Sequence, residues 1–189
     1  MSDQERTLVA VASVLDEHGV PYVVIGGLAN AVWGEPRATL DIDVTVWVDE
    51  PEIAAVAEVL TSEFDVLVSD PVEFVKENRV LPLSSVSGVR IDVIFGLLPF
   101  ERDAIQRGVA RAVAGGSVRF CTAEDLILMK IVSERERDRA DAEGVALRRM
   151  AELDLAYLEP RVRELADLLA RPEIWQRWSA WKERAARRP

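Results

Sequence analysis

The stretch from Val23 to Val48, VVIGGLANAVWGEPRATLDIDVTVWV, decides which folds this chain can adopt. It holds an apolar run typical of a buried strand, the pair Gly26-Gly27, a short helix-like piece, and a second apolar run with Asp41 and Asp43. Side chains alternate faces along a strand, so Asp41 and Asp43 are predicted to share one face. Two such carboxylates repel each other unless a positive group lies between them, and a divalent cation with oxygen ligands is the obvious candidate.

A third carboxylate lies in another strand-like run, VRIDVIF, from Val89 to Phe95. Asp92 is predicted to lie on the face opposite the apolar side chains of this run. If the two strands are neighbours, Asp92 joins Asp41 and Asp43, and three carboxylates can hold two magnesium ions for an in-line displacement at phosphorus. The alternative is three solvated aspartates on half-exposed strands, although aspartate is depleted in strands.

The pair Gly26-Gly27 strengthens the metal interpretation. Glycines between a strand and a helix let backbone amides approach a phosphate, and a helix N-terminus favours the phosphate charge. Alone the pair is a weak signal, because many turns contain two glycines. No Walker lysine follows it, and the dinucleotide-binding fingerprint is absent.

The whole sequence predicts an α/β fold with a mixed sheet flanked by helices, followed by a C-terminal helical part. We expect helices at 4–18, 28–33, 52–62 and 100–107, and strands at 21–25, at Asp41 and the residues after it, and at 64–68, 74–81, 89–95, 109–113 and 118–120. Gly115-Gly116 predicts a hairpin turn. From Thr122 onward the pattern is helical, and Thr122 with Asp125 resembles a capping box. We therefore expect a core at residues 1–120 and a helical region at residues 121–189.

The order GG, then G-x-x-R-x-T-x-D-x-D, then a strand with an aspartate between apolar residues resembles the nucleotidyltransferase superfamily of the DNA polymerase beta type. More narrowly, it resembles the AbiEii-type nucleotidyltransferase toxins and their minimal nucleotidyltransferase relatives. The matching residues are Gly26, Gly27, Ala29, Gly34, Arg37, Thr39, Asp41, Asp43 and Asp92. In that family a helix carries a lysine and an Arg-x-x-Asp-x-x-Asp-like stretch follows it; here the candidates are Lys130, Arg135 or Arg137, Asp138 and Asp141. The resemblance covers roughly residues 20 to 150.

The resemblance implies a metal-dependent enzyme that moves a nucleoside monophosphate from a nucleoside triphosphate (NTP) to a hydroxyl acceptor and releases pyrophosphate. Asp41, Asp43 and Asp92 would bind Mg²⁺ or Mn²⁺, and the triphosphate would be positioned by Gly26, Gly27, Arg37, Thr39 and Lys130. Little covalent chemistry falls to the protein in such a transfer, which depends on positioning and charge stabilisation.

Three of these residues have a second interpretation. Lys130 lies in the apolar segment LILMKIV, where it either snorkels to the surface or reaches the triphosphate. Arg37 either contacts phosphate or lies at the surface. Asp141 either polarises the acceptor or pairs with Arg137 four residues earlier in the helix.

Charge is distributed unevenly along the chain, whose formal net charge is −10. Residues 161–189 hold eight Arg and Lys against four Asp and Glu, a net of +4, while residues 1–160 hold 15 against 29, a net of −14. A basic segment on an acidic body can present a patch to RNA, attract a cationic small substrate to the acidic part, or be a solvated helix face. Trp175, Trp178 and Trp181 recur at helical spacing and predict a packing face, with a base-stacking platform as the alternative.

The acceptor is therefore open at this point. The resemblance favours RNA, in particular tRNA, or a protein target in a toxin–antitoxin system with a cognate antitoxin as partner. An aminoglycoside-type small acceptor is the second possibility, and a non-catalytic nucleotide- or partner-binding module is the third. The single cysteine, Cys121, suits a reducing compartment, and no signal-peptide or membrane-spanning pattern occurs, so we expect a cytoplasmic protein with no membrane partner.

Overall fold

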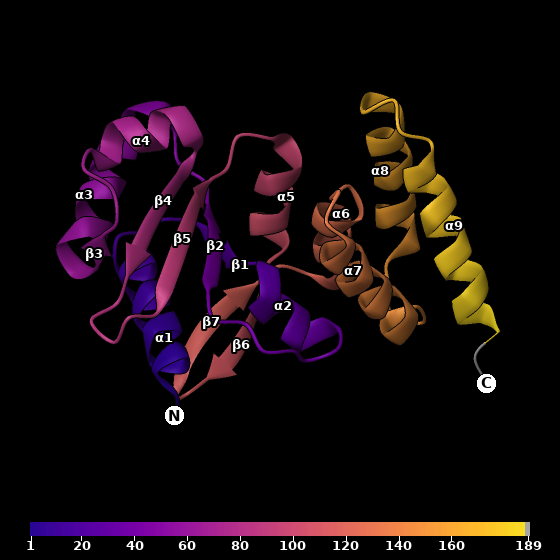
Figure 1. Cartoon of the computed structure of the whole chain (residues 1–189), viewed down its shortest axis with the longest axis horizontal. Helices are drawn as coiled ribbons and strands as arrows, with labels where there is room; N and C mark the ends of the chain where they lie inside the picture. The colour runs from indigo at the N-terminus through magenta and orange to yellow at the C-terminus, as the bar shows by residue number, and fades with distance from the viewer. Residues whose placement is uncertain (188–189) are drawn as a thin grey trace. The chain divides into compact units, whose positions relative to one another are not determined.

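The computed structural model describes residues 1–187, which form two compact units (Figure 1). The first unit comprises residues 1–28 and 38–121, and the second comprises residues 29–37 and the chain from Thr122 onward. Helix α2 (Gly26–Trp33) contains the first point of division. The domain boundary expected after residue 120 stays a prediction; the structure groups residues 29–37 with the C-terminal helices.

The first unit is built on a seven-stranded mixed sheet in the order β3-β4-β5-β2-β1-β7-β6. The strands are β1 (Tyr22–Val24), β2 (Ile42–Val46), β3 (Asp65–Val66), β4 (Val80–Ser84), β5 (Arg90–Phe95), β6 (Val109–Val113) and β7 (Gly116–Phe120). The helices are α1 (Asp3–Glu17), the 3₁₀ turn η1 (Glu50–Glu52), α3 (Ile53–Glu63), α4 (Pro71–Asn78) and α5 (Pro99–Arg107). The predicted fold, a mixed sheet flanked by helices with a helical C-terminal part, is confirmed.

Strands β2 and β5 lie side by side near the middle of this sheet and run parallel. Ile42, Val44 and Val46 of β2 are fully buried, and β5 alternates buried and half-buried residues along its length. Helix α5 packs against β1 and β2, and α1 packs against β7. The alternation predicted from the sequence is thus present, and it leaves the aspartates of both strands on the less buried face.

The strand expected at residues 74–81 is wrong for most of its length, because residues 71–78 form helix α4. Asp70 caps this helix through its side chain, which accepts a hydrogen bond from the Glu73 amide at 3.1 Å, and Pro71 occupies the first turn. Arg79 ends the helix in a left-handed conformation with φ of 57°. An aspartate followed by proline is a helix-start signal, and here it prevails over the apolar residues that follow.

The hairpin expected around Gly115-Gly116 is confirmed, with its turn at Ala114 and Gly115 instead. Both turn residues have positive φ, 49° and 87°, as a two-residue hairpin turn of this hand requires. Strand β7 then begins at Gly116 and pairs antiparallel with β6.

The second unit contains helices α6 (Ala123–Ile131), α7 (Glu136–Arg149), α8 (Leu155–Leu168) and α9 (Glu173–Ala186). Thr122 caps α6 as predicted, and its hydroxyl accepts a hydrogen bond from the Asp125 amide at 3.2 Å. Ile174, Trp178 and Trp181 are buried on α9, which packs against α7 and α8. The packing-face interpretation is therefore correct for Trp178 and Trp181, whereas Trp175 is half-exposed. Among residues 1–187, no helix is long and apolar enough to cross a membrane.

We predict that Trp178→Ala lowers the free energy of unfolding by about 3–5 kcal/mol, because it empties a fully buried site. It also removes the donor of a 3.2 Å hydrogen bond to Glu159. Trp175→Ala is the matched control: its ring is half-exposed and contacts the Arg163 guanidinium at 3.9 Å, so we expect a loss of about 1 kcal/mol. Urea unfolding followed by circular dichroism measures both, and equal losses would contradict the assignment of Trp178 to the core.

Candidate functional site

Two of the three predicted aspartates are direct neighbours in the sheet. Asp43 of β2 stands opposite Asp92 of β5 in the parallel register. Both are half-buried, and the residues on either side of each in its strand point to the buried face. Asp41 is exposed and lies one residue before β2 begins, so it belongs to the segment that leads into the strand. The fold thus places two carboxylates side by side and the third at the entrance to the same strand.

The donor chemistry of these residues suits a hard divalent cation, because carboxylate oxygens are the ligands that Mg²⁺ prefers. One cation already lies against Asp92: Arg90 Nε is 3.2 Å from Oδ1 and 3.3 Å from Oδ2. Within residues 1–187, however, no group of three or more His, Cys, Asp or Glu side chains is gathered so that it could hold a metal ion. The expected convergence of Asp41, Asp43 and Asp92 on a metal therefore stays a prediction, supported by strand register and ligand chemistry.

The two glycines are required by close contacts with this part of the sheet. Gly26 has φ of 64°, and a Cβ atom there would overlap the Asp43 carboxylate. A Cβ atom on Gly27 would lie 2.6 Å from the Thr39 hydroxyl oxygen. Helix α2 begins at Gly26 itself, two residues earlier than the helix expected at residues 28–33. The start of α2 is consequently held directly against Asp43 and Thr39, two of the residues predicted for the site.

Lys130, in the second unit, is buried and does not snorkel. Its side chain is 8% exposed, and its ammonium group donates hydrogen bonds to Asp138 Oδ1 at 2.7 Å and to Asp141 Oδ2 at 2.9 Å. Asp138 also accepts a hydrogen bond from the Ser133 hydroxyl at 2.9 Å. The lysine is tolerated in the apolar helix α6 because two carboxylates of α7 balance its charge.

Arg37 pairs with Asp141, which belongs to the same unit. Its Nε and Nη2 atoms lie 3.0 Å from Oδ1 and 2.9 Å from Oδ2, the two-pronged geometry that a guanidinium and a carboxylate favour. Neither interpretation of Arg37 anticipated this pair, and Asp141 is bound by Arg37 and Lys130 where pairing with Arg137 was one expectation. Asn30 completes the group by donating to Asp141 Oδ1 at 3.3 Å.

Asn30 and Gly34 are residues whose roles the sequence did not indicate. A Cβ atom on Gly34 would lie 2.5 Å from Asn30 Oδ1 and 2.9 Å from a methyl group of Val145, so only glycine fits there. Gly34 was noticed as part of a family pattern, but the pattern gave no physical reason for it. The available signal was weak: a glycine four residues after an asparagine, at the end of a short helix.

Burial and hydrogen bonding act in opposite directions on the two aspartates of α7. For Asp141, burial tends to raise the pKa, but the hydrogen bonds from Arg37 and Lys130 outweigh it and hold the pKa below its usual value of 3.8. For Asp138, burial is again opposed by hydrogen bonds from Lys130 and Ser133, and the pKa is also lowered. Both groups are therefore firmly ionised at neutral pH.

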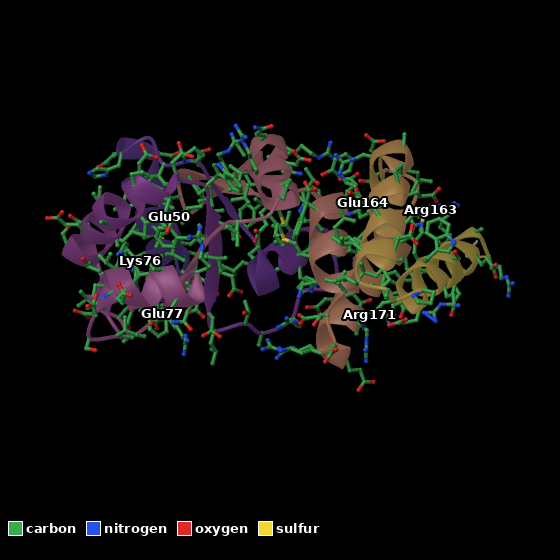
Figure 2. All side chains as sticks on the ribbon, turned by 90° about the horizontal axis from the view of Figure 1, so that it is seen from above. Glu50, Lys76, Glu77, Arg163, Glu164 and Arg171 are labelled. Carbon is green, nitrogen blue, oxygen red and sulfur yellow. The ribbon has the colours of Figure 1, made fainter. Side chains whose placement is uncertain are left out.

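Four arginines of the basic C-terminal segment have partners within the second unit. Arg163 lies on α8 and Arg171 in the connection that follows it, as Figure 2 shows. The contacts are Arg161 over the Tyr157 ring at 3.8 Å, Arg163 over the Trp175 ring at 3.9 Å, Arg171 with the Val132 carbonyl at 2.8 Å, and Arg177 with the Ile131 carbonyl at 2.7 Å. Arg171 and Arg177 thus donate to carbonyls at the C-terminal end of α6, as basic residues there often do.

We predict that Gly26→Ala destabilises the protein more than Gly19→Ala does. The two glycines have nearly equal φ, 64° and 66°, so both substitutions cost about 1–2 kcal/mol in backbone strain. At Gly19 a Cβ atom meets nothing within 4 Å, whereas at Gly26 it forces Asp43 to move, at a further cost of about 1–3 kcal/mol. Urea unfolding gives both values, and equal losses would mean that Asp43 is free to move away.

A second prediction concerns the acid stability of the second unit. Because the pKa of Asp141 is lower in the folded state, its contribution is present above the unfolded pKa of about 3.9 and disappears as pH falls through the folded value. The difference in unfolding free energy between the wild type and Asp141→Asn should therefore shrink as pH falls from 5 to 2.5. A difference that stays constant over this range would show that the Asp141 pKa is not lowered by folding.

The chain matches one protein family and is similar in fold to several solved structures. The family described as "Nucleotidyl transferase of unknown function (DUF2204)" matches residues 4–171. No curated protein matches the chain. Among solved structures, the fold is similar to an antigenic nucleotidyltransferase-like protein from Paracoccidioides brasiliensis, with a TM-score of 0.53 and 15% identity over 93% of this chain and 92% of that chain.

Two further structures have similar folds. The antibiotic-resistance factor ANT(2'')-Ia has a TM-score of 0.56 and 15% identity, with all of both chains covered. The lincosamide antibiotic adenylyltransferase LnuA has a TM-score of 0.50 and 13% identity, covering 77% of this chain and 96% of that chain. At such identities the likeness shows the fold alone, and the narrower AbiEii-type resemblance stays a prediction. Since the family match spans most of the sequence, the chain belongs to the family "Nucleotidyl transferase of unknown function (DUF2204)" and is a nucleotidyltransferase.

Proposed function

We propose that this chain transfers a nucleoside monophosphate from an NTP to a hydroxyl group of an acceptor, with divalent metal ions held by Asp41, Asp43 and Asp92. The observation that carries the proposal is the register of β2 and β5, which sets Asp43 beside Asp92, with the start of α2 packed against Asp43. A sheet that only needed stability would not place two like charges opposite each other in neighbouring strands.

The reaction makes one bond and breaks one. The acceptor oxygen attacks the α-phosphorus, the bond from that phosphorus to the bridging oxygen breaks, and pyrophosphate leaves with the electron pair while the acceptor loses its proton. When bound, the metal ions supply positive charge for the phosphates and lower the pKa of the acceptor hydroxyl. Gly26 and Gly27 offer backbone amides at the start of α2, and Thr39 offers a hydroxyl beside Gly27. Lys130 provides the positive charge for the triphosphate.

For the acceptor, we favour a small hydroxylated molecule over RNA. Arg161, Arg163, Arg171 and Arg177 are engaged with rings or carbonyls, which restrains their side chains and occupies donors that a nucleic-acid backbone would need. Residues 1–160 carry a net charge of −14, which suits a cationic acceptor. Among similar folds, one structure of ANT(2")-Ia holds adenylyl-2"-tobramycin and that of LnuA holds lincomycin.

RNA and protein acceptors form the second candidate. They rest on the resemblance to toxin-type enzymes, which would add a cognate antitoxin as a partner. A non-catalytic binding role is the third candidate. It does not explain why Asp43 and Asp92 are neighbours beside a helix that begins with two glycines.

The proposal is tested by incubating the full chain with Mg²⁺ or Mn²⁺ and each NTP labelled at the α-phosphate. Tobramycin, lincomycin, total RNA and the protein itself serve as acceptors. We expect label on a small acceptor; label on RNA or protein only would reverse the choice of acceptor, and no label on any acceptor would count against catalysis.

In this assay, Asp43→Asn and Asp92→Asn should each lower turnover at least about a hundredfold, because even the partners that surround metal ligands are worth about 10–100-fold. Asp65→Asn, on the exposed edge strand β3 of the same sheet, is the matched control and should be silent. Lys130→Met should raise the KM for the NTP. Full activity of Asp43→Asn would refute the assignment of this residue to the metal site.

A further inference from the structure

The charged side chains around Lys130, of which Lys130 and Asp141 are buried, form a neutral group that the reaction chemistry above does not explain. It contains two cations, Lys130 and Arg37, and two anions, Asp138 and Asp141, with Asn30 as an uncharged fifth member. Asp141 is its centre, because every other member except Asp138 donates to it. Such a group either activates the acceptor directly or holds Lys130 in place for the triphosphate.

We propose that Asp141 is a positioning residue, which Arg37 and Asn30 fix and which in turn holds the Lys130 ammonium group. On this account Asp141 does not take the proton of the acceptor hydroxyl. Arg37 acts through Asp141 and does not contact the phosphates. The inference rests on the proposed function, because it assigns Lys130 to the triphosphate.

The first argument is that the oxygens of Asp141 are already occupied. Oδ1 accepts from Asn30 at 3.3 Å and from Arg37 Nε at 3.0 Å. Oδ2 accepts from Lys130 at 2.9 Å and from Arg37 at 2.9 and 3.3 Å. A carboxylate accepting this many charged donors, with a lowered pKa, is a weak proton acceptor.

The second argument comes from Asn30, which is 1% exposed. Its amide nitrogen donates to the Glu35 carbonyl at 3.0 Å and to Asp141, while its Oδ1 atom has no hydrogen-bond partner among the described residues. Both partners of the nitrogen are acceptors, so the amide cannot be flipped. An unpartnered buried oxygen costs about 1–3 kcal/mol. The cost of this buried oxygen accompanies two hydrogen bonds from the Asn30 amide nitrogen, one that holds the backbone at Glu35 and one that is aimed at Asp141.

The net charge of the group predicts a different effect of Asp141→Asn on NTP binding for each possible role of Asp141. Asp141→Asn changes the group from neutral to a net of +1, which on charge alone would strengthen the binding of a triphosphate. If Asp141 positions Lys130, the same substitution weakens binding despite the added positive charge. If Asp141 is the base, kcat falls while NTP binding stays unchanged or becomes tighter.

The experiment measures the Kd of the full chain for Mg²⁺ complexes of ATP, GTP, CTP and UTP by titration calorimetry, and kcat with the acceptor that takes label. We expect Asp141→Asn to weaken the tightest-binding NTP about tenfold or more, the size of a lost hydrogen bond to a charged group. Arg37→Met should weaken it similarly, and Arg37→Lys, which keeps the charge, should restore part of the loss. Thermal unfolding of each variant confirms that it is folded.

Arg148→Met is the matched control, because Arg148 also joins α7 to the 29–37 segment, through an exposed ion pair with Glu35 at 3.7 Å. It should leave Kd and kcat unchanged. Tighter NTP binding by Asp141→Asn, or an unchanged Kd with a collapsed kcat, would overturn the positioning role and leave the proposed function standing. A wild-type chain that binds none of the four NTPs would overturn both, whereas loss of turnover in Asp43→Asn alongside an unchanged Kd in Arg37→Met would overturn only the inference.

Discussion

Parallel pairing of β2 with β5 is the constraint on which the rest of the first unit depends. A register shift of one residue would move every side chain of β2 to the opposite face, burying Asp43 and exposing Ile42 and Val44. The fully buried apolar residues of both strands therefore fix the position of the carboxylates as firmly as they fix the core. Gly26 extends this constraint to α2, because its close approach to Asp43 is possible only without a side chain.

The carboxylates of the two units differ in how they are paired with cations. In the first unit, Asp43 and Asp92 are neighbours in the sheet. Arg90 pairs with Asp92, but its side chain is 56% exposed, so this ion pair is weak. In the second, one buried carboxylate, Asp141, and one half-buried carboxylate, Asp138, are matched by two cations. The first arrangement is suited to bind a cation that arrives with the substrate. The charges of the second arrangement balance one another and hold its side chains in a fixed geometry.

Much of this could be predicted from local sequence patterns. The alternation in IDVTV and VRIDVIF predicted the two strands and the face of Asp43 and Asp92, and the segment after Gly26-Gly27 predicted a short helix, which in the structure includes both glycines. The strand expected at 74–81 is wrong because the Asp70-Pro71 helix start prevails over the apolar residues that follow it. The pairing of Arg37 with Asp141 could not be predicted, since no local rule links residues 104 positions apart. The resemblance had marked both residues for the site without indicating that they touch.

The distance in sequence between Arg37 and Asp141 affects how the second unit folds. Residues 29–37 leave the ribosome about a hundred residues before α7 is available, so the C-terminal helices cannot complete their charged centre from their own segment. Closing so long a loop carries an entropic cost and slows folding relative to a bundle of consecutive helices. Proteolysis between residues 121 and 122 would release a helical fragment that lacks Arg37, in which Lys130 faces two carboxylates alone. The C-terminal helices are thus not a detachable module, and a transplant to another scaffold would have to carry the short N-terminal segment with them.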